Sequence, residues 1–333
     1  FFFASTMIRL LPAIACAAVL VLSQCHFACA TFTIGGADTA THQIGAAGAS
    51  CVVNHSIYNA TYAVAVPGSS LLLAQAATED RVQVLDMGRT LLQKGTAPDA
   101  VIKAITDPAL DGAFFAVFPY YTVRQYGVVD VKGRTAGYTG PLLDLLYATA
   151  VSLPKTDQSH RHGTTGSYAY SAQGNVVTKR TVQTLQSTFV GSSGCDLADR
   201  LMEAVDAVST AGEGDARCIV DGFTAGVHAP IPGTGAYLHV ENPDGTDLVH
   251  IDVVGDGTFN PVKRLREEYD AWRAKHPCPL PEWPSGAPVF PPTWDHGAEV
   301  YPPWWPSSAS TVVARFALLI CCTIAVICGL EFC

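Results

Sequence analysis

Residues 28–36 read ACATFTIGG, and they mark the point where a strongly apolar leader ends and an alternating segment begins. A basic residue, Arg9, precedes the apolar run LLPAIACAAVLVLS, and small residues flank the end of the leader. This arrangement predicts a secretory signal peptide in residues 1–30, cleaved after Ala30. The first residue of the mature chain would then be Thr31.

The far end of the chain is also apolar. The run FALLICCTIAVICGL follows a group of small residues, a pattern that resembles the signal for a glycosylphosphatidylinositol (GPI) anchor. A transmembrane helix is the alternative, although about 20 apolar residues usually span a bilayer and this run is shorter. Either interpretation makes residues 311–333 a hydrophobic anchor segment. Residues 279–310 are rich in proline and tryptophan and predict a stiff stalk, and residues 1–6 precede the first methionine as an ambiguous start.

Composition narrows the classes of function. The 333 residues are 49% hydrophobic and 15% charged, with a formal net charge of -9. Nucleic-acid binding depends on lysine and arginine contacts to phosphate, so this charge and the absence of a basic run argue against nucleic acid as a partner. The region between the two ends is long enough for one large domain, 31–278.

Four cysteines lie in that region: Cys51, Cys195, Cys218 and Cys278. None has the spacing of a zinc knuckle, so two disulfides in an oxidising compartment are the better interpretation. Three connectivities are open. We favour Cys195 with Cys218, which bracket one predicted helix, and by default Cys51 with Cys278; the first bridge would contribute roughly 3 kcal/mol.

The pattern of the body places strands in clusters and helices in consecutive pairs. Strand-like runs include TFTIGG, HQIGAAGASCVV, TYAVAV, LLLAQAA, GSYAYSAQGNVV, RCIV, AYLHV and LVHIDVV, and the segment around Lys132-Gly133 predicts a hairpin. Helical spacing recurs in residues 82–92, 96–105, 181–189, 197–208 and 260–276. This order favours antiparallel sheet with helices layered outside it.

An N-terminal threonine has a particular chemistry. Its hydroxyl is a weak nucleophile until a base lies within hydrogen-bond reach, and the free α-amine of the same residue, with a reference pKa near 8, can be that base. Any residue left in front of Thr31 would convert the amine into an amide. Cleavage after Ala30 would therefore create the base.

Several motifs occur in an order that resembles one protein family. They are TFTIGGAD, IGAAGASC, LLAQAA, RQYGVVDVKGRTAGYTG, YSAQGN, CDLADRLMEAV and GEGDARC. Together they resemble the domain of unknown function 1028 family, which looks like a member of the N-terminal-nucleophile (Ntn) hydrolase superfamily. The resemblance implies an α+β fold, a four-layer αββα sandwich of two antiparallel sheets, but supplies no substrate.

Carried over position by position, the resemblance selects five candidate catalytic residues, of which Thr31 would be the nucleophile. Ser50 matches a serine after the second strand. Gln75, Gln173 and Asn175 would orient a substrate or stabilise an oxyanion, whereas the alternative is that they only satisfy turn backbone. The chain departs from the family pattern at Ala74, which precedes the glutamine, and in the insertion CVVNHSIYNAT.

Three further residues are candidate substrate contacts. Asp130 stands before a Lys-Gly turn and is otherwise a turn residue, and Asp215 with Arg217 is otherwise a loop salt bridge. His160 and His162 lack a nearby carboxylate or cysteine in sequence, so we expect a solvated loop there. We expect no metal and no cofactor.

The sequence therefore predicts a secreted, surface-anchored Ntn-type hydrolase that acts on a small-molecule or peptide amide. The alternative is a non-catalytic cell-surface binding or adhesion protein, because a fold does not determine a function. Asn54 and Asn59 lie in N-glycosylation sequons, which fit an exposed loop of a secreted glycoprotein. The membrane would be a partner through the C-terminal segment, and the oligomeric state stays open, a homodimer included.

Overall fold

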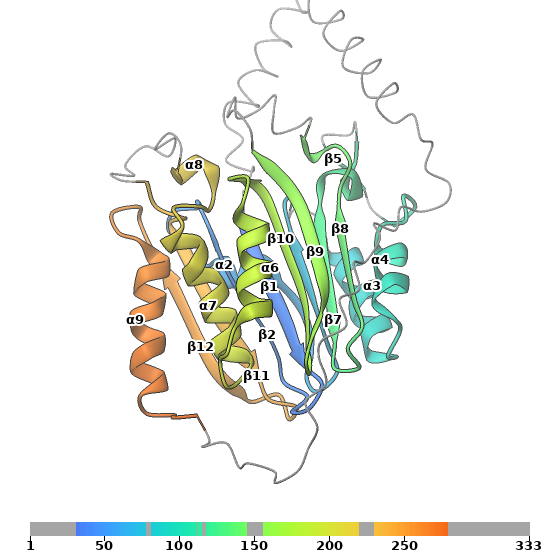
Figure 1. Ribbon diagram of the computed structural model, residues 1–333. Coiled ribbons are helices and arrows are strands. Elements are labelled where there is room, and N and C mark those ends of the chain that lie inside the picture. The colour runs from blue at the N-terminus through green and yellow to red at the C-terminus, as the bar shows by residue number, and fades with distance from the viewer. Residues whose placement is uncertain are drawn as a thin grey trace, which may run out of the picture. The chain divides into compact units, whose positions relative to one another are not determined.

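The computed structural model describes residues 31–77, 81–110, 112–114, 118–144, 156–219 and 230–278, all within one compact unit. These residues form two stacked antiparallel sheets with helices outside both (Figure 1). The architecture is the four-layer αββα sandwich that the sequence predicts.

The larger sheet has six strands. Its order is β12 (Asp247–Val254), β11 (Gly235–Glu241), β2 (Ile44–Ser50), β1 (Thr31–Asp38), β10 (Tyr168–Val177) and β9 (Asp157–Thr165). Strand β1 is therefore central, paired with β2 on one side and β10 on the other.

The smaller sheet has four strands in the order β3 (Tyr62–Val66), β4 (Ser70–Gln75), β7 (Gln125–Asp130) and β8 (Thr135–Thr139). The predicted hairpin around Lys132-Gly133 is confirmed as β7 and β8. A separate short ribbon consists of β5 (Ala113–Phe114) and β6 (Phe118–Pro119), followed by the 3-10 helix η1 (Tyr120–Val123).

Helices cover the outer face of each sheet. The larger sheet carries α6 (Thr181–Gly191), α7 (Leu197–Thr210) and α9 (Pro261–Arg273), and the smaller carries α3 (Val82–Gln93) and α4 (Pro98–Ile105) (Figure 1). Alternation along β1 explains the layering, because Phe32 and Ile34 pack toward α6 and α7 while Ala37 packs between the sheets. Residues of β4 divide in the same way, with Leu71 and Leu73 between the sheets and Leu72 under the helices.

Small residues let neighbouring strands and the two sheets approach closely. A Cβ at Gly48 would lie 2.6 Å from the carbonyl oxygen of Phe32 in the neighbouring strand. A Cβ at Gly127 would lie 2.7 Å from Ser171 Oγ and 2.9 Å from Gln173 Oε1 in the opposite sheet. Only glycine fits at these two contacts without displacement of a neighbour.

Two disulfides are present, but the favoured pairing was wrong. Cys51 bonds to Cys218, and Cys195 bonds to Cys278. The physical reason is the length of α7, whose 14 residues lie between Cys195 and Cys218 in the chain. At 1.5 Å per residue the helix is about 21 Å long, far beyond the Cα–Cα distance of about 7 Å that a disulfide can bridge.

Two local expectations are also corrected. The run RCIV was expected as a strand, yet Ala216–Ile219 form helix α8, because the Asp215 carbonyl accepts hydrogen bonds from the N–H groups of Cys218 and Ile219. His160 and His162 were expected in a loop, yet they lie in β9. Their rings contact Thr139 and Thr135 of β8, at 2.9 and 3.0 Å, and so join the edges of the two sheets.

The insertion with the two sequons contains a short helix, α2 (Ile57–Thr61), rather than only a loop. Ile57 and Thr61 are buried, and the Thr61 hydroxyl lies 3.0 Å from Tyr237 Oη. Asn54 and Asn59 are exposed. The insertion is thus attached to β11, while the side chains of both sequon asparagines face solvent.

The expected signal peptide, stalk and anchor segment lie outside the described residues. Within the described part of the chain, no helix combines the length and the apolar character that a membrane crossing requires.

Candidate functional site

Thr31 is the first residue of β1, between Ser50 of β2 and Asn175 of β10 in register. Its side chain is buried, with 2% exposure, and its Oγ1 lies 3.2 Å from Ser50 Oγ. Thr33, two residues along the same face, donates a hydrogen bond to Gln75 Oε1 of the other sheet at 2.7 Å. The Thr31 side chain therefore belongs to the face of β1 that lies between the sheets.

Gln75 is the last residue of β4 and connects the two sheets. Its Nε2 lies within hydrogen-bond distance of three carbonyl oxygens: 3.0 Å from Thr31 O, 2.9 Å from Gln125 Oε1 and 3.0 Å from Asn175 Oδ1. Four of the five predicted catalytic residues, Thr31, Ser50, Gln75 and Asn175, thus meet at one end of the sandwich. We call this region the Thr31 end.

Gln125 is a member of this group that sequence reasoning missed. It pairs with Gln75 in register, is fully buried, and its Nε2 lies 2.8 Å from the Gly174 carbonyl oxygen. A signal was present in the sequence. Arg124 and Gln125 directly precede the run YGVVD, which predicts a strand. Polar side chains that are buried at the start of a strand need hydrogen-bond partners, so this pair indicates a polar contact inside the fold.

Arg124 was missed as well. Its side chain is 1% exposed, its Nε donates to the Ala77 carbonyl oxygen at 2.8 Å, and its guanidinium lies 4.4 Å from the centre of the Tyr120 ring. A buried guanidinium next to Gln125 adds positive charge at the Thr31 end.

Gln173, the fifth predicted catalytic residue, lies two residues deeper along β10, opposite Thr33. It is fully buried, and neither Nε2 nor Oε1 has a hydrogen-bond partner among the described residues. A buried unpaired amide is costly, by about 1–3 kcal/mol. Among the described residues, the Gln173 amide therefore has both its donor and its acceptor unpaired.

Asp215 and Arg217 lie beside the Thr31 end. The buried Asp215 carboxylate accepts hydrogen bonds from Cys51 N at 2.7 Å and from Arg217 Nε and a terminal nitrogen at 3.1 and 2.8 Å. The pair is a bidentate ion pair, the strongest form of this contact. Because Cys51 follows Ser50, Asp215 fixes the end of β2 at which Ser50 is held.

Asp130 is not brought to this site. It pairs with Ser70 at the opposite end of β4, five residues from the Gln75–Gln125 pair and so about 16 Å away along the strand. Its carboxylate accepts hydrogen bonds from Lys132 N and from Arg134 N and Nε. These contacts close the β7–β8 turn, so Asp130 has the role of a turn residue.

The backbone at the Thr31 end is strained. Ala76 and Ala77, directly after Gln75, have φ values of 57° and 35°, and Val176, directly after Asn175, has φ 51°. Positive φ is unfavourable for alanine and more so for a β-branched residue. Strain of this kind costs about 1–3 kcal/mol per residue and clusters at functional sites.

A buried hydrogen-bond network gives a stability prediction. We expect Gln75→Leu to lower the free energy of unfolding by about 3 kcal/mol, because three buried carbonyl oxygens lose their donor. Gln43→Leu is the matched control, since Gln43 is half-buried and its side-chain amide donates to Asn242 Oδ1 at 3.1 Å, and we expect a loss of at most about 1 kcal/mol. Urea unfolding measures both; equal losses would contradict a central role for Gln75.

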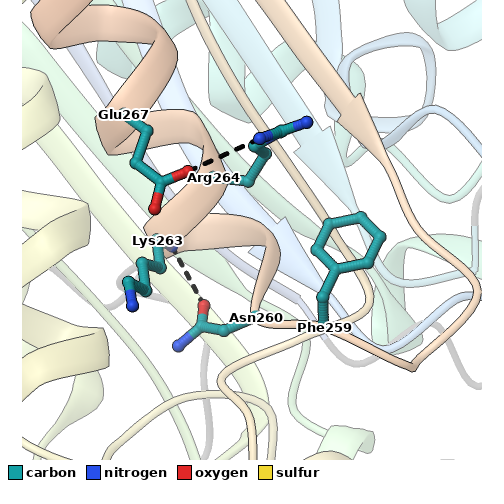
Figure 2. Close-up of a pocket in the computed structure, with 5 residues that line it drawn as sticks. All are labelled: Phe259, Asn260, Lys263, Arg264 and Glu267. Atoms are coloured by element: carbon teal, nitrogen blue, oxygen red, sulfur yellow. Dashed lines mark hydrogen bonds and ion pairs between the residues drawn. The ribbon is translucent and has the colours of Figure 1, made fainter.

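Two groups of side chains lie outside the Thr31 end and do not form a reactive site. A pocket of about 460 Å³ lies at the start of α9, lined by Phe259, Asn260, Lys263, Arg264 and Glu267 (Figure 2). Asn260 already caps the helix and Arg264 pairs with Glu267 at 3.6 Å. The polar side chains of the pocket are therefore already paired with the helix or with each other.

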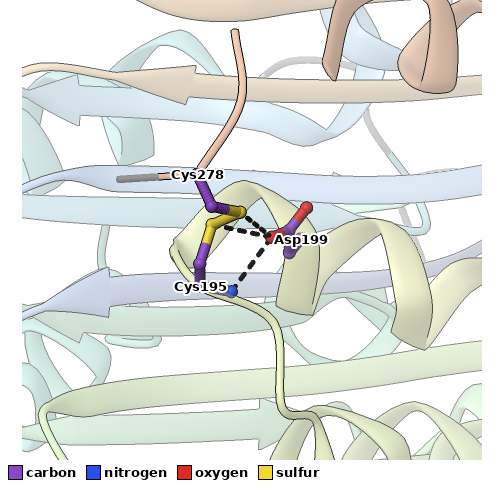
Figure 3. A group of neighbouring side chains, drawn as sticks. All are labelled: Cys195, Asp199 and Cys278. Atoms are coloured by element: carbon purple, nitrogen blue, oxygen red, sulfur yellow. Dashed lines mark hydrogen bonds between the residues drawn. A yellow bond between two sulfur atoms is a disulfide. The ribbon is translucent and has the colours of Figure 1, made fainter. Parts of the chain in front are cut away.

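The second group is Cys195, Asp199 and Cys278 (Figure 3). Both sulfur atoms are in the disulfide, so they cannot act as thiolate ligands. The Asp199 carboxylate instead accepts a hydrogen bond from Cys195 N at 3.0 Å. This group is a structural junction between the start of α7 and the segment after α9.

The chain is thus an αββα sandwich with a polar site at one end of its two sheets, and this site includes Thr31. The model of a family described as "Family of unknown function (DUF1028)" matches residues 31–225. The chain belongs to this family.

A solved structure agrees with the fold. The crystal structure of protein SPO2555 from Silicibacter pomeroyi, described with the same family model, is similar to this chain with a TM-score of 0.51 and 19% identity, covering 73% of this chain and 89% of that one. No curated protein matches the chain.

Proposed function

We propose that this protein is an Ntn-type hydrolase that cuts an amide bond, with Thr31 as its nucleophile. The observation that carries the proposal is the position of Thr31. It starts the central strand, its hydroxyl lies 3.2 Å from Ser50 Oγ, and its carbonyl oxygen lies 3.0 Å from the amide of Gln75. A nucleophile held by neighbours on three strands is pre-organised for attack.

The proposed reaction has two stages. Thr31 Oγ attacks the carbonyl carbon of the substrate amide, while the free α-amine of Thr31 takes the hydroxyl proton and passes it to the leaving nitrogen. The C–N bond breaks and an ester to Thr31 remains. Water, deprotonated by the same amine, then attacks the ester and releases the acid.

The negative charge that develops on the carbonyl oxygen needs donors. We assign this role to the amides of Asn175 and Gln173, the first beside Thr31 in register and the second buried with its amide unpaired. Donors already in place stabilise an oxyanion without reorganisation, and loss of one such donor typically costs about 10²–10³ in kcat. The buried Arg124 supports the same charge.

The end of the chain in front of Thr31 gives the direct test. A chain that begins at Thr31 is compared with one that carries a single extra glycine before it, and both are treated with a β-lactone that acylates nucleophiles. We expect acylation at Thr31 only in the first chain, because the extra residue turns the base into an amide. Intact-mass and fragment-mass analysis locate the acyl group. Equal labelling of both chains would refute the role of the amine.

The natural mature protein supplies an independent measurement. N-terminal sequencing of the secreted chain is expected to begin at Thr31. Any other start would remove the proposed base, whatever the fold. The same preparation tests the proposed attachment to a membrane, since release from cells by a phosphatidylinositol-specific phospholipase is expected for a GPI anchor, and retention for a transmembrane helix.

One observation favours the second candidate, a non-catalytic binding protein. The amides of Gln75 and Gln125 find partners within the protein, as in a structural network. A correctly processed chain that neither reacts with the β-lactone nor hydrolyses amides would support this candidate.

A further inference from the structure

A second polar cluster lies away from the Thr31 end, on β11 and β12. His239 and His250 face each other across this strand pair, on the side opposite to the apolar residues that pack under α7 and α9. Along β11, Gly235 pairs with Ser50, and His239 is four residues farther on, about 13 Å away. The cluster is therefore separate from the proposed catalytic residues.

Three metal-ligating side chains converge there. His239 Nε2 lies 2.7 Å from Asp247 Oδ1, and His250 Nδ1 lies 3.8 Å from Asp247 Oδ2. One ligand atom from each residue falls within 4.8 Å of the others. Ligands at 2.0–2.2 Å around a tetrahedral ion are about 3.4 Å apart, so small side-chain rotations complete the geometry.

The buried ring of His239 points to a ligand. Its side chain is 3% exposed, and within the described part of the chain Nδ1 has no hydrogen-bond partner, although Glu241 Oε1 lies 3.7 Å away. When a neutral ring donates Nε2–H to Asp247, Nδ1 is a bare acceptor that faces a carboxylate. A metal ion on Nε2 moves the proton to Nδ1, which then donates to Glu241 and satisfies both nitrogens.

Glu241 is held for this role. Tyr62 Oη donates a hydrogen bond to Glu241 Oε1 at 3.0 Å, which fixes the position of the carboxylate. A carboxylate on the far nitrogen of a metal-bound histidine is the usual outer partner, because it fixes the tautomer and raises ligand basicity. Tyr58 of α2 covers the two imidazoles, with ring centres 5.0 and 4.5 Å away.

The geometry points to a divalent transition-metal site formed by His239, Asp247 and His250, with Glu241 as outer partner and zinc as the best-fitting ion. Two imidazoles and one carboxylate are typical zinc ligands. His250 is half-exposed, so water can fill the fourth position. The site does not depend on the proposed hydrolase activity.

Zinc binding to the folded mature chain tests this site. We expect one zinc ion per chain in competition with a chromophoric chelator, and Co²⁺ in its place should give the visible absorption of a tetrahedral nitrogen–oxygen site. Glu241→Gln preserves the Tyr62 contact but removes the outer charge, so affinity should fall by about 10–100-fold. His250→Ala removes a ligand and should lower affinity further.

The matched control is His276→Ala, which removes an exposed histidine outside the cluster and should leave zinc affinity unchanged. Circular dichroism checks that each variant is folded. Failure of the native chain to bind zinc, or native affinity in His250→Ala, would overturn the proposal. If a proton on His239 takes the place of the metal ion, the native chain will fail to bind zinc.

Discussion

Thr31→Ala is expected to reduce amide hydrolysis by about 10⁴-fold or more, because the substitution removes the proposed attacking oxygen and keeps only the α-amine. The free energy of unfolding should change by only about 1 kcal/mol, the usual net contribution of a hydrogen bond such as the one from Thr31 Oγ1 to Ser50 at 3.2 Å. Turnover of a panel of aminoacyl and peptide amides measures the loss, and urea unfolding measures stability.

Thr31→Ser is the control for this result. Serine keeps the hydroxyl and the α-amine, so activity should survive. The active chain should gain rate as pH rises toward the pKa of the amine, with a reference value near 8, because only the unprotonated amine accepts the hydroxyl proton. Full turnover by Thr31→Ala would mean that the reacting group lies elsewhere.

Removal of the Cys51–Cys218 disulfide is expected to have the largest effect on stability. The bridge joins residues 167 positions apart, and loop-closure entropy gives about 5 kcal/mol for a loop of this size. Replacing both cysteines by alanine should lower the free energy of unfolding by about 4–5 kcal/mol, measured by urea unfolding under non-reducing conditions.

The second disulfide is a matched control. Cys195 and Cys278 are exposed and 83 positions apart, so their double replacement by alanine should cost about 4 kcal/mol. Only loss of the Cys51 bridge should also reduce β-lactone labelling, because Cys51 follows Ser50 and its N–H contacts Asp215. Equal labelling of both variants would show that this bridge does not position the Thr31 end.

Much of the fold follows from local pattern. Phe32 and Ile34 alternate with Thr31 and Thr33, and that alternation alone places the threonines on one face of β1. The hairpin at Lys132-Gly133 is equally local. The family resemblance added the four-layer arrangement, which periodicity does not specify.

Contacts between distant segments could not be predicted in the same way. Cys51 bonds to Cys218 because the end of β2 lies beside α8 in the tertiary fold. The spacing of the cysteines in the sequence does not show this. Gln125 is a site residue only because β4 pairs with β7 in one register. Strand preference depends on contacts with neighbouring strands, and the rings of His160 and His162 in β9 contact β8.

The hydrogen bonds of the amides between the sheets run in one direction, from donor to acceptor. The Thr33 hydroxyl gives its hydrogen to Gln75, Gln75 gives to Gln125, and Gln125 gives to a backbone carbonyl of β10. A backbone carbonyl oxygen can only accept a hydrogen bond, so this series of donors and acceptors cannot be reversed. The two threonines at the start of β1 therefore differ: the Thr33 hydroxyl donates across to the other sheet, whereas the Thr31 hydroxyl donates to Ser50 in the neighbouring strand of its own sheet, at 3.2 Å.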